Sequence, residues 1–149
     1  MQLNFPAYNF KIKRQENANY VFDIIRKKFI LLTPEEWVRQ HLVHFLANDR
    51  GFPLSRIAVE RGLKVNGLKK RFDVLIFDSL GMPQLLAECK APDIKLSEET
   101  LMQVSVYNSH FGAGHLLVTN GLQHFYFYSK NGKMVAGDGI PHYESIRVK

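Results

Sequence analysis

The chain has 149 residues, of which 46% are hydrophobic and 23% are charged, with a formal net charge of +6 and an isoelectric point near 9.5. This composition is typical of a globular protein and excludes a disordered chain, and no apolar run approaches the roughly 20 residues that cross a bilayer. We therefore expect a single domain over residues 1–149 with no membrane segment, whose basic charge favours an acidic partner such as nucleic acid.

Two features predict a cytoplasmic location. The amino terminus lacks the charged-then-apolar order of a signal peptide. Cys89 is the only cysteine, so the sequence holds neither an internal disulfide nor a cysteine-based zinc site, as is usual in a reducing compartment.

The amino-terminal third predicts strands followed by a helix. Residues 1–32 contain the strand-like segments FKIKR and YVFDIIRKKFIL around the polar turn QENAN, and we expect a strand-like extension there. Thr33 and Pro34, followed by two glutamates, are typical of a helix start, which predicts a helix over residues 34–47. His41 and His44 lack the spacing of a paired metal motif, which favours ordinary packing.

The rest of the chain predicts a three-stranded meander, a second helix and two more strands. SRIAVERGLKV and LKKRFDVLIFD are joined by Asn66-Gly67, a strong hairpin signal, and QLLAECKA follows a short loop, so the meander covers residues 56–91. Ser97 and the glutamates after it predict a helix to about residue 110, and HLLVT and HFYFYS predict strands. We expect an α/β fold with a mixed sheet flanked by helices.

Three charged residues interrupt these apolar strands: Asp73, Glu88 and Lys90. Charged side chains are rarely buried unless they are paired or bind a metal. Glu88 and Lys90 are two residues apart and therefore share one face of their strand. Ala87 and Cys89, on either side of Glu88, point to the opposite face.

Counting along the hairpins predicts that carboxylates meet. A four-residue loop over residues 79–82 pairs Asp78 with Pro83 and sets Asp73 opposite Glu88 on one face. The Asn66-Gly67 turn sets Glu60 opposite Asp73 by the same count. Opposed carboxylates repel, so the arrangement requires a cation, and oxygen donors favour Mg²⁺ or Mn²⁺ over zinc.

These residues resemble a known signature. Asp73, followed after a hairpin by Glu88-Cys89-Lys90, is similar to the D...(D/E)xK signature of the PD-(D/E)xK nuclease superfamily, which implies a restriction-endonuclease-like core. Gln103 and Tyr107 form a Q-x-x-x-Y pattern similar to that of RecB-like nucleases. The phrases TPEEWVRQHLVHFL, VERGLKVNGLKKRFDVLIFD, LLAECKAPDIKL and LLVTNG resemble the amino-terminal nuclease domain of type I restriction enzyme R subunits over about residues 30–122. Phe72 stands where the superfamily has proline, and the 149 residues contain no helicase motor.

The resemblance implies a Mg²⁺-dependent DNA endonuclease that acts on double-stranded DNA. It implies that Asp73, Glu88 and the backbone carbonyl of Cys89 bind the Mg²⁺ or Mn²⁺ ion, and that Lys90 orients the attacking water. Further metal-ligand candidates are Glu35, Glu36 and Glu60, with Glu35 favoured on the first helix because it shares a face with apolar residues. The resemblance assigns catalytic support to Gln103 and Tyr107, and the DNA-binding candidates are Lys69, Lys70, Arg71 and Tyr107. Other restriction-modification subunits or a separate motor are further candidate partners.

Each assignment has an alternative. Asp73 could pair with a neighbouring basic residue, Glu60 could be solvated, the helix glutamates could serve only the helix dipole, and the Q-x-x-x-Y residues could lie on an ordinary exposed face. For the function, the alternatives are a module of the same fold that binds DNA or docks subunits without cleaving, and an interaction protein whose charge is incidental. The sequence leaves the oligomeric state open.

Overall fold

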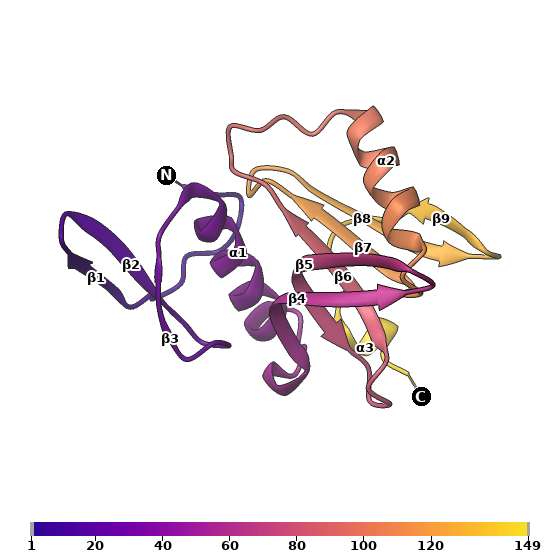
Figure 1. Cartoon of the computed structure of the whole chain (residues 1–149), viewed down its shortest axis with the longest axis horizontal. Helices are drawn as coiled ribbons and strands as arrows, with labels where there is room; N and C mark the ends of the chain where they lie inside the picture. The colour runs from indigo at the N-terminus through magenta and orange to yellow at the C-terminus, as the bar shows by residue number, and fades with distance from the viewer. Residues whose placement is uncertain (1, 149) are drawn as a thin grey trace.

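The computed structural model describes residues 2–148 and has a mixed α/β fold built on two sheets (Figure 1). A small antiparallel sheet has the order β1-β2-β3, and a larger mixed sheet has the order β4-β5-β6-β7-β8-β9, with β6 and β7 parallel. The strands are β1 Ile12–Gln15, β2 Ala18–Asp23, β3 Lys28–Leu31, β4 Ile57–Val65, β5 Leu68–Phe77, β6 Pro83–Cys89, β7 His115–Thr119, β8 His124–Lys130 and β9 Lys133–Ala136. The helices are α1 Pro34–His44, α2 Glu98–Ser109 and the short α3 Tyr143–Ile146.

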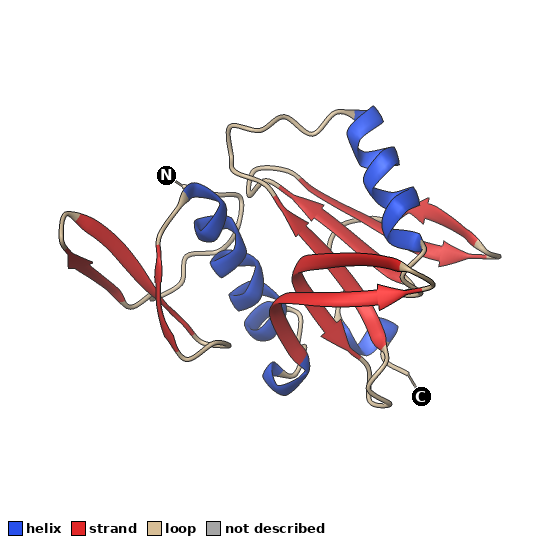
Figure 2. Ribbon diagram, in the orientation of Figure 1, coloured by secondary structure: helices blue, strands red, loops and turns tan. Residues whose placement is uncertain are grey.

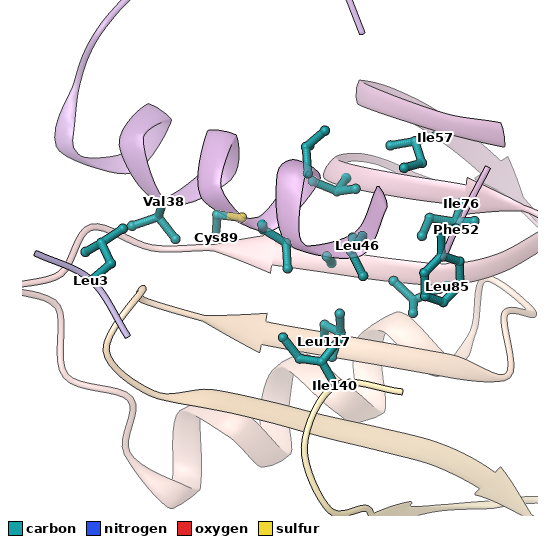
Figure 3. Close-up of a cluster of buried hydrophobic side chains, with 14 residues drawn as sticks. Leu3, Val38, Leu46, Phe52, Ile57, Ile76, Leu85, Cys89, Leu117 and Ile140 are labelled. Carbon is teal, nitrogen blue, oxygen red and sulfur yellow. The ribbon is translucent and has the colours of Figure 1, made fainter. Parts of the chain in front are cut away.

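Helices cover both faces of the six-stranded sheet (Figure 2). Figure 3 shows Val38 of α1 and Leu46 of the turn after it in one buried cluster with Ile76, Leu85 and other side chains of the sheet. The opposite face forms a second apolar cluster that continues into the segment after α2; its buried members are Phe72, Leu75, Leu86, Phe111, Ala113 and Leu116. No helix within residues 2–148 is long and apolar enough to span a bilayer.

The predicted order of elements is confirmed, with differences at the ends. The hydroxyl of Thr33 caps α1 and that of Ser97 caps α2, as the sequence indicates. The first helix is regular only to His44, and a π-helical turn, Phe45–Asp49, completes the predicted length. The strand-like extension forms its own sheet and does not join the large one.

Two elements were missed by sequence analysis. Strand β9 pairs with β8 through a two-residue turn in which Lys130 faces Lys133. The turn residues are Asn131 and Gly132, both with positive φ, so the same hairpin signal that predicts the β4–β5 turn also occurs here. The short helix α3 has no capping side chain to mark its start.

The predicted pairing of Asp78 with Pro83 is wrong, although the register beyond it is right. Phe77 pairs with Pro83, because the Asp78 carboxylate accepts hydrogen bonds from the backbone N–H groups of Leu80 and Met82 and so belongs to the turn. A bulge after this pair restores the predicted count. Val74 therefore pairs with Ala87, which is the last pair of the ladder. Continuing its register by one residue places Asp73 opposite Glu88, where the two strands separate.

The buried ring of His44 predicts how stability depends on pH. Burial, with the nearby His41, lowers the pKa of His44 below its ordinary 6.5, and its Nε2 atom has no hydrogen-bond partner among the described residues. Because the unfolded chain takes up this proton first, the protein should lose stability as pH falls below about 6.5.

Replacing the ring tests this account. His44→Phe should raise the free energy of unfolding at pH 7 by about 1 kcal/mol, because it removes a buried unpaired nitrogen, and by more at pH 5. Urea unfolding at both pH values measures the difference. The exposed His142→Asn is the control and should change neither value. An equal loss of stability between pH 7 and 5 in His44→Phe and the unmodified protein would contradict the account.

Candidate functional site

The candidate site lies where β5 separates from β6. Strand β5 pairs with β4 along nearly its whole length, but with β6 only from Val74 to Phe77. Beyond that point, the backbone N–H of Cys89 donates a hydrogen bond of 2.7 Å to the Asp73 carboxylate. The Asp73 side chain thus lies at the fork between the two strands and satisfies a backbone donor at the end of β6.

The β4–β5 hairpin also twists at this fork. Val74 packs on the α1 side of the sheet, whereas Phe72, two residues earlier, packs on the α2 side. Strict alternation would keep both on one face. Glu60, which lies opposite Asp73 between the pairs of β4 and β5, has a φ of +49°, a left-handed conformation that is rare outside glycine. The twist turns the outer half of the hairpin and opens a space beside the end of β6.

This space is a polar pocket of about 330 Å³. It brings together the three residues on which the sequence argument rests, Asp73, Glu88 and Lys90. Its other lining residues are Thr33, Glu35, Arg39, Glu60, Arg71 and Phe72. Four carboxylates and three basic side chains therefore border one pocket, contributed by α1, both strands of the hairpin and the end of β6.

Arg39 of α1 neutralises the acids on one side of the pocket. Its guanidinium lies 3.1 Å from Asp73, 3.3 Å from Glu60 and 3.0 Å from Glu36, and the side chain is 7% exposed. Arg26, from the turn between β2 and β3, reaches Glu36 at 3.0 Å and Glu60 at 3.6 Å. Sequence analysis missed both arginines, since each meets acids that are distant along the chain.

The carboxyl of Asp73 has a raised pKa. Burial above all, together with the charges of Glu88 and Glu35, raises the pKa of Asp73 to about 6, against the opposing effects of the Cys89 N–H and Arg39. A carboxyl with a raised pKa gains from any additional cation that approaches it. This is the electrostatic condition under which a divalent ion binds.

Glu88 is held by residues on the α2 side. The Lys70 ammonium forms an ion pair with its carboxylate and donates a 2.8 Å hydrogen bond to Asn108, which is fully buried on α2. Asn108 in turn donates to Glu88 at 3.4 Å. Asn108 was missed by sequence analysis, although it directly follows Tyr107 of the Q-x-x-x-Y pattern.

The remaining predicted site residues fall into two groups. Gln103 and Tyr107 are both exposed on α2, and neither lines the pocket. The Tyr107 ring lies 5.2 Å from the ammonium of Lys70, the residue that pairs with Glu88. Lys69 and Arg71 are exposed on the β4–β5 hairpin, whereas Lys70 is occupied with Glu88.

The two first-helix glutamates separate clearly. Glu36 is buried and bonded to Arg26, Arg39 and Gln40, so its carboxylate is fully engaged. Glu35 is exposed and borders the pocket. The first-helix glutamate available to the pocket is therefore Glu35.

The pocket residues fit a hard divalent cation in chemistry, although they are not arranged as a closed cage. The acidic side chains that line the pocket offer oxygen ligands, which hard divalent cations prefer. The Cys89 thiol offers no sulfur ligand to the pocket, because it is buried in the core beneath α1 (Figure 3), where burial raises its pKa. Within residues 2–148, no three histidine, cysteine or acidic side chains converge closely enough to hold an ion. The reason is visible in the contacts, since Arg39 and Lys70 already neutralise Asp73 and Glu88.

Fold and site together define a mixed α/β protein with an acidic pocket at a fork in its sheet. The family model described as type I restriction enzyme R protein N terminus matches residues 34–141. Because this match covers most of the chain, the protein belongs to that family. The matched region starts at α1 and contains every pocket residue except Thr33, whereas β1–β3 precede it. No curated protein matches the chain.

Metal binding is the first test of the pocket. Isothermal titration with Mn²⁺ should detect one site, and Asp73→Asn should weaken it at least tenfold, because it removes a charged oxygen ligand. Lys70→Met should tighten binding severalfold, because Glu88 then loses its competing cation.

Glu144→Gln supplies the control for these titrations. Glu144 is an exposed acid on α3, paired with Arg147, and its loss should leave the Mn²⁺ affinity unchanged. Unaltered affinity in Asp73→Asn would contradict the assignment of the pocket.

Proposed function

We propose that the protein is a Mg²⁺-dependent DNA endonuclease domain that hydrolyses phosphodiester bonds, with the PD-(D/E)xK arrangement at Asp73, Glu88 and Lys90. The observation that carries the proposal is the pocket in which these three side chains meet and in which the Asp73 carboxyl has a raised pKa. Membership of the restriction R-subunit family supports it, because that family is nuclease-like. Double-stranded DNA and other restriction-modification subunits are the corresponding partners.

Each residue of the pocket has a distinct role in the proposed hydrolysis. Asp73 and Glu88, with the carbonyl of Cys89, would hold the ion. The two additional acids of the pocket are Glu35 and Glu60, of which Glu60 is paired with Arg26 and Arg39. The ion would supply a bound water of lowered pKa and positive charge beside the scissile phosphate. Lys90 positions the attacking water and stabilises negative charge that develops on the phosphate. Lys69 and Arg71, exposed on the hairpin, contact the DNA backbone.

One observation favours a second candidate, a module that binds DNA or docks subunits without cutting. Arg39 and Lys70 already neutralise the two central carboxylates, so the pocket is stable as an internal ion-pair network. Such a network needs no metal. The two candidates differ in one measurable property, which is cleavage.

Lys90→Ala separates them. Supercoiled plasmid incubated with the protein and Mg²⁺ or Mn²⁺ should be nicked, and Lys90→Ala should reduce the rate at least 100-fold, because its charge acts in the transition state. Its thermal stability and DNA affinity should change little. The gel assay for nicked plasmid, with a chelator as blank, measures the rate.

Lys95→Ala is the matched control, since Lys95 is an exposed lysine five residues along the chain and outside the pocket. It should cut as fast as the unmodified protein. Equal rates for Lys90→Ala and the unmodified protein would refute the catalytic role of Lys90. If the unmodified protein cuts with neither metal, the non-cleaving module becomes the function.

Duplex binding should depend steeply on salt and little on sequence, because lysine and arginine contacts are to phosphates. The Lys69→Ala/Arg71→Ala double variant should lower the slope of log affinity against log salt by about 2, which fluorescence anisotropy with two unrelated duplexes measures. A slope unchanged by the double variant would exclude this hairpin from the DNA interface.

A further inference from the structure

The small sheet β1–β3 presents one face outward. Cross-strand pairing sets Tyr20 between Lys13 and Leu31, and Phe22 beside Phe29, while the backbone N–H of Phe22 bonds to the carbonyl of Lys11. Residues two apart on a strand share a face. We call this face the platform; it consists of Lys11, Lys13, Tyr20, Phe22, Phe29 and Leu31.

The two faces of the small sheet differ in burial. Val21 and Asp23 of β2 point away from the platform and are 0% and 2% exposed, so β2 packs against the rest of the protein on that face, whereas Ile12 of β1 on the same face is 46% exposed. On the platform, Phe29 is 37% and Leu31 49% exposed, and Tyr20 is half-buried. Three aromatic residues therefore share this face, with Phe29 exposed and Tyr20 and Phe22 half-buried. The small sheet that carries them lies on the side of α1 away from the large sheet (Figure 1).

Lysines are interleaved with these rings. The Lys11 ammonium lies 5.6 Å from the centre of the Phe22 ring, and that of Lys13 lies 4.4 Å from the Phe29 ring. The two phenylalanine rings are themselves 5.4 Å apart at 72°. Each ammonium lies over a ring in the free protein. A base that stacks on the ring would displace the ammonium toward the adjoining phosphate, and a ring with a nearby cation is the pair of contacts that each nucleotide of a single strand requires.

The charge of the chain is concentrated in this segment. Residues 1–32 contain six basic and two acidic residues, a net charge of +4 out of the +6 of the whole chain. Asp23, one of the two acids, is buried and paired with Arg26. The exposed charge on and around the platform is thus strongly positive, which complements a polyanion and disfavours an apolar protein partner.

The platform is firmly joined to the pocket. The Asp23 carboxylate, on its buried face, accepts hydrogen bonds from Arg26 and from Gln40 of α1, and Arg26 continues to Glu36 and Glu60. Strand β3 ends at Leu31, and Thr33, two residues later, borders the pocket. The sheet that carries the platform is therefore fixed in position relative to the pocket.

We propose that the platform binds single-stranded DNA, with bases stacked on Phe29, Phe22 and Tyr20 and phosphates at Lys11 and Lys13. The site lies outside the family match, which begins at residue 34. It goes beyond the proposed function, because binding to the platform requires neither the metal nor cleavage.

The test uses the full chain and fluorescently labelled oligothymidine in chelator, followed by anisotropy. The protein should bind this single strand more tightly than a duplex of equal length. Phe29→Leu keeps an apolar side chain but removes the ring, and should weaken binding about tenfold, the effect of losing one stacked base. Phe29→Trp retains a ring and should bind at least as tightly, with quenching of the added tryptophan.

The lysines are tested by charge-matched double variants. Lys11→Ala/Lys13→Ala should lower the salt slope for oligothymidine by about 1.4. Lys130→Ala/Lys133→Ala removes the same charge from the exposed β8–β9 turn and should leave the slope unchanged. Equal affinity of Phe29→Leu and the unmodified protein, with unaltered circular dichroism, would overturn the proposal. So would equal slopes for the two double variants.

Two further measurements separate this proposal from the proposed function. Tighter binding of oligouridine than of oligothymidine would replace DNA by RNA as the occupant and so overturn the proposal as stated. If the unmodified protein nicks plasmid and Phe29→Leu binds oligothymidine normally, the endonuclease proposal stands and the proposed single-strand site on the platform is wrong. If the unmodified protein nicks no plasmid but Phe29→Leu loses oligothymidine binding, the single-strand site on the platform is supported and the endonuclease proposal is wrong.

Discussion

The buried guanidinium of Arg39 is the interaction on which the arrangement of the site depends. It leaves α1 and meets Asp73 of β5 and Glu60 of β4, along with Glu36 of its own helix. A cation this far from water is tolerated only when acids surround it. Helix, hairpin and, through Arg26, the small sheet are therefore fixed in one orientation, and the fold brings carboxylates together around a charge of its own.

The fork in the sheet is the second constraint, and it places the acids around an open pocket. At Asp73 the hairpin leaves β6, the side chains change faces and Glu60 takes a left-handed backbone. Local departures of this kind concentrate at functional sites, where the surrounding structure must hold them in place. Arg39 and Lys70 occupy the same carboxylates that a divalent ion would use, so in the proposed function the ion would have to compete with these two internal cations.

The pocket and the platform belong to different parts of the chain. The pocket lies almost wholly within the region matched by the restriction R-subunit family, and the platform lies before it. In the proposed scheme the family-matched region supplies the hydrolytic chemistry, and the preceding sheet supplies a way of holding a strand near it. The link between the two is the Asp23, Arg26 and Glu36 network, so a strand on the platform has a defined position relative to Asp73.

The sequence alone determined the order of helices and strands, the Asn66-Gly67 turn and the register that sets Asp73 opposite Glu88, because capping, turn chemistry and alternation are local. The candidate site residues Asp73, Glu88 and Lys90 followed from the same count. Only the tertiary structure decided that Arg39 and Lys70 neutralise the acids, that Glu35 and not Glu36 borders the pocket, and that Asn108 bridges Lys70 and Glu88. These contacts join residues from different elements, and the bend and twist of the hairpin that create them arise from packing on both faces of the sheet, which no local pattern encodes.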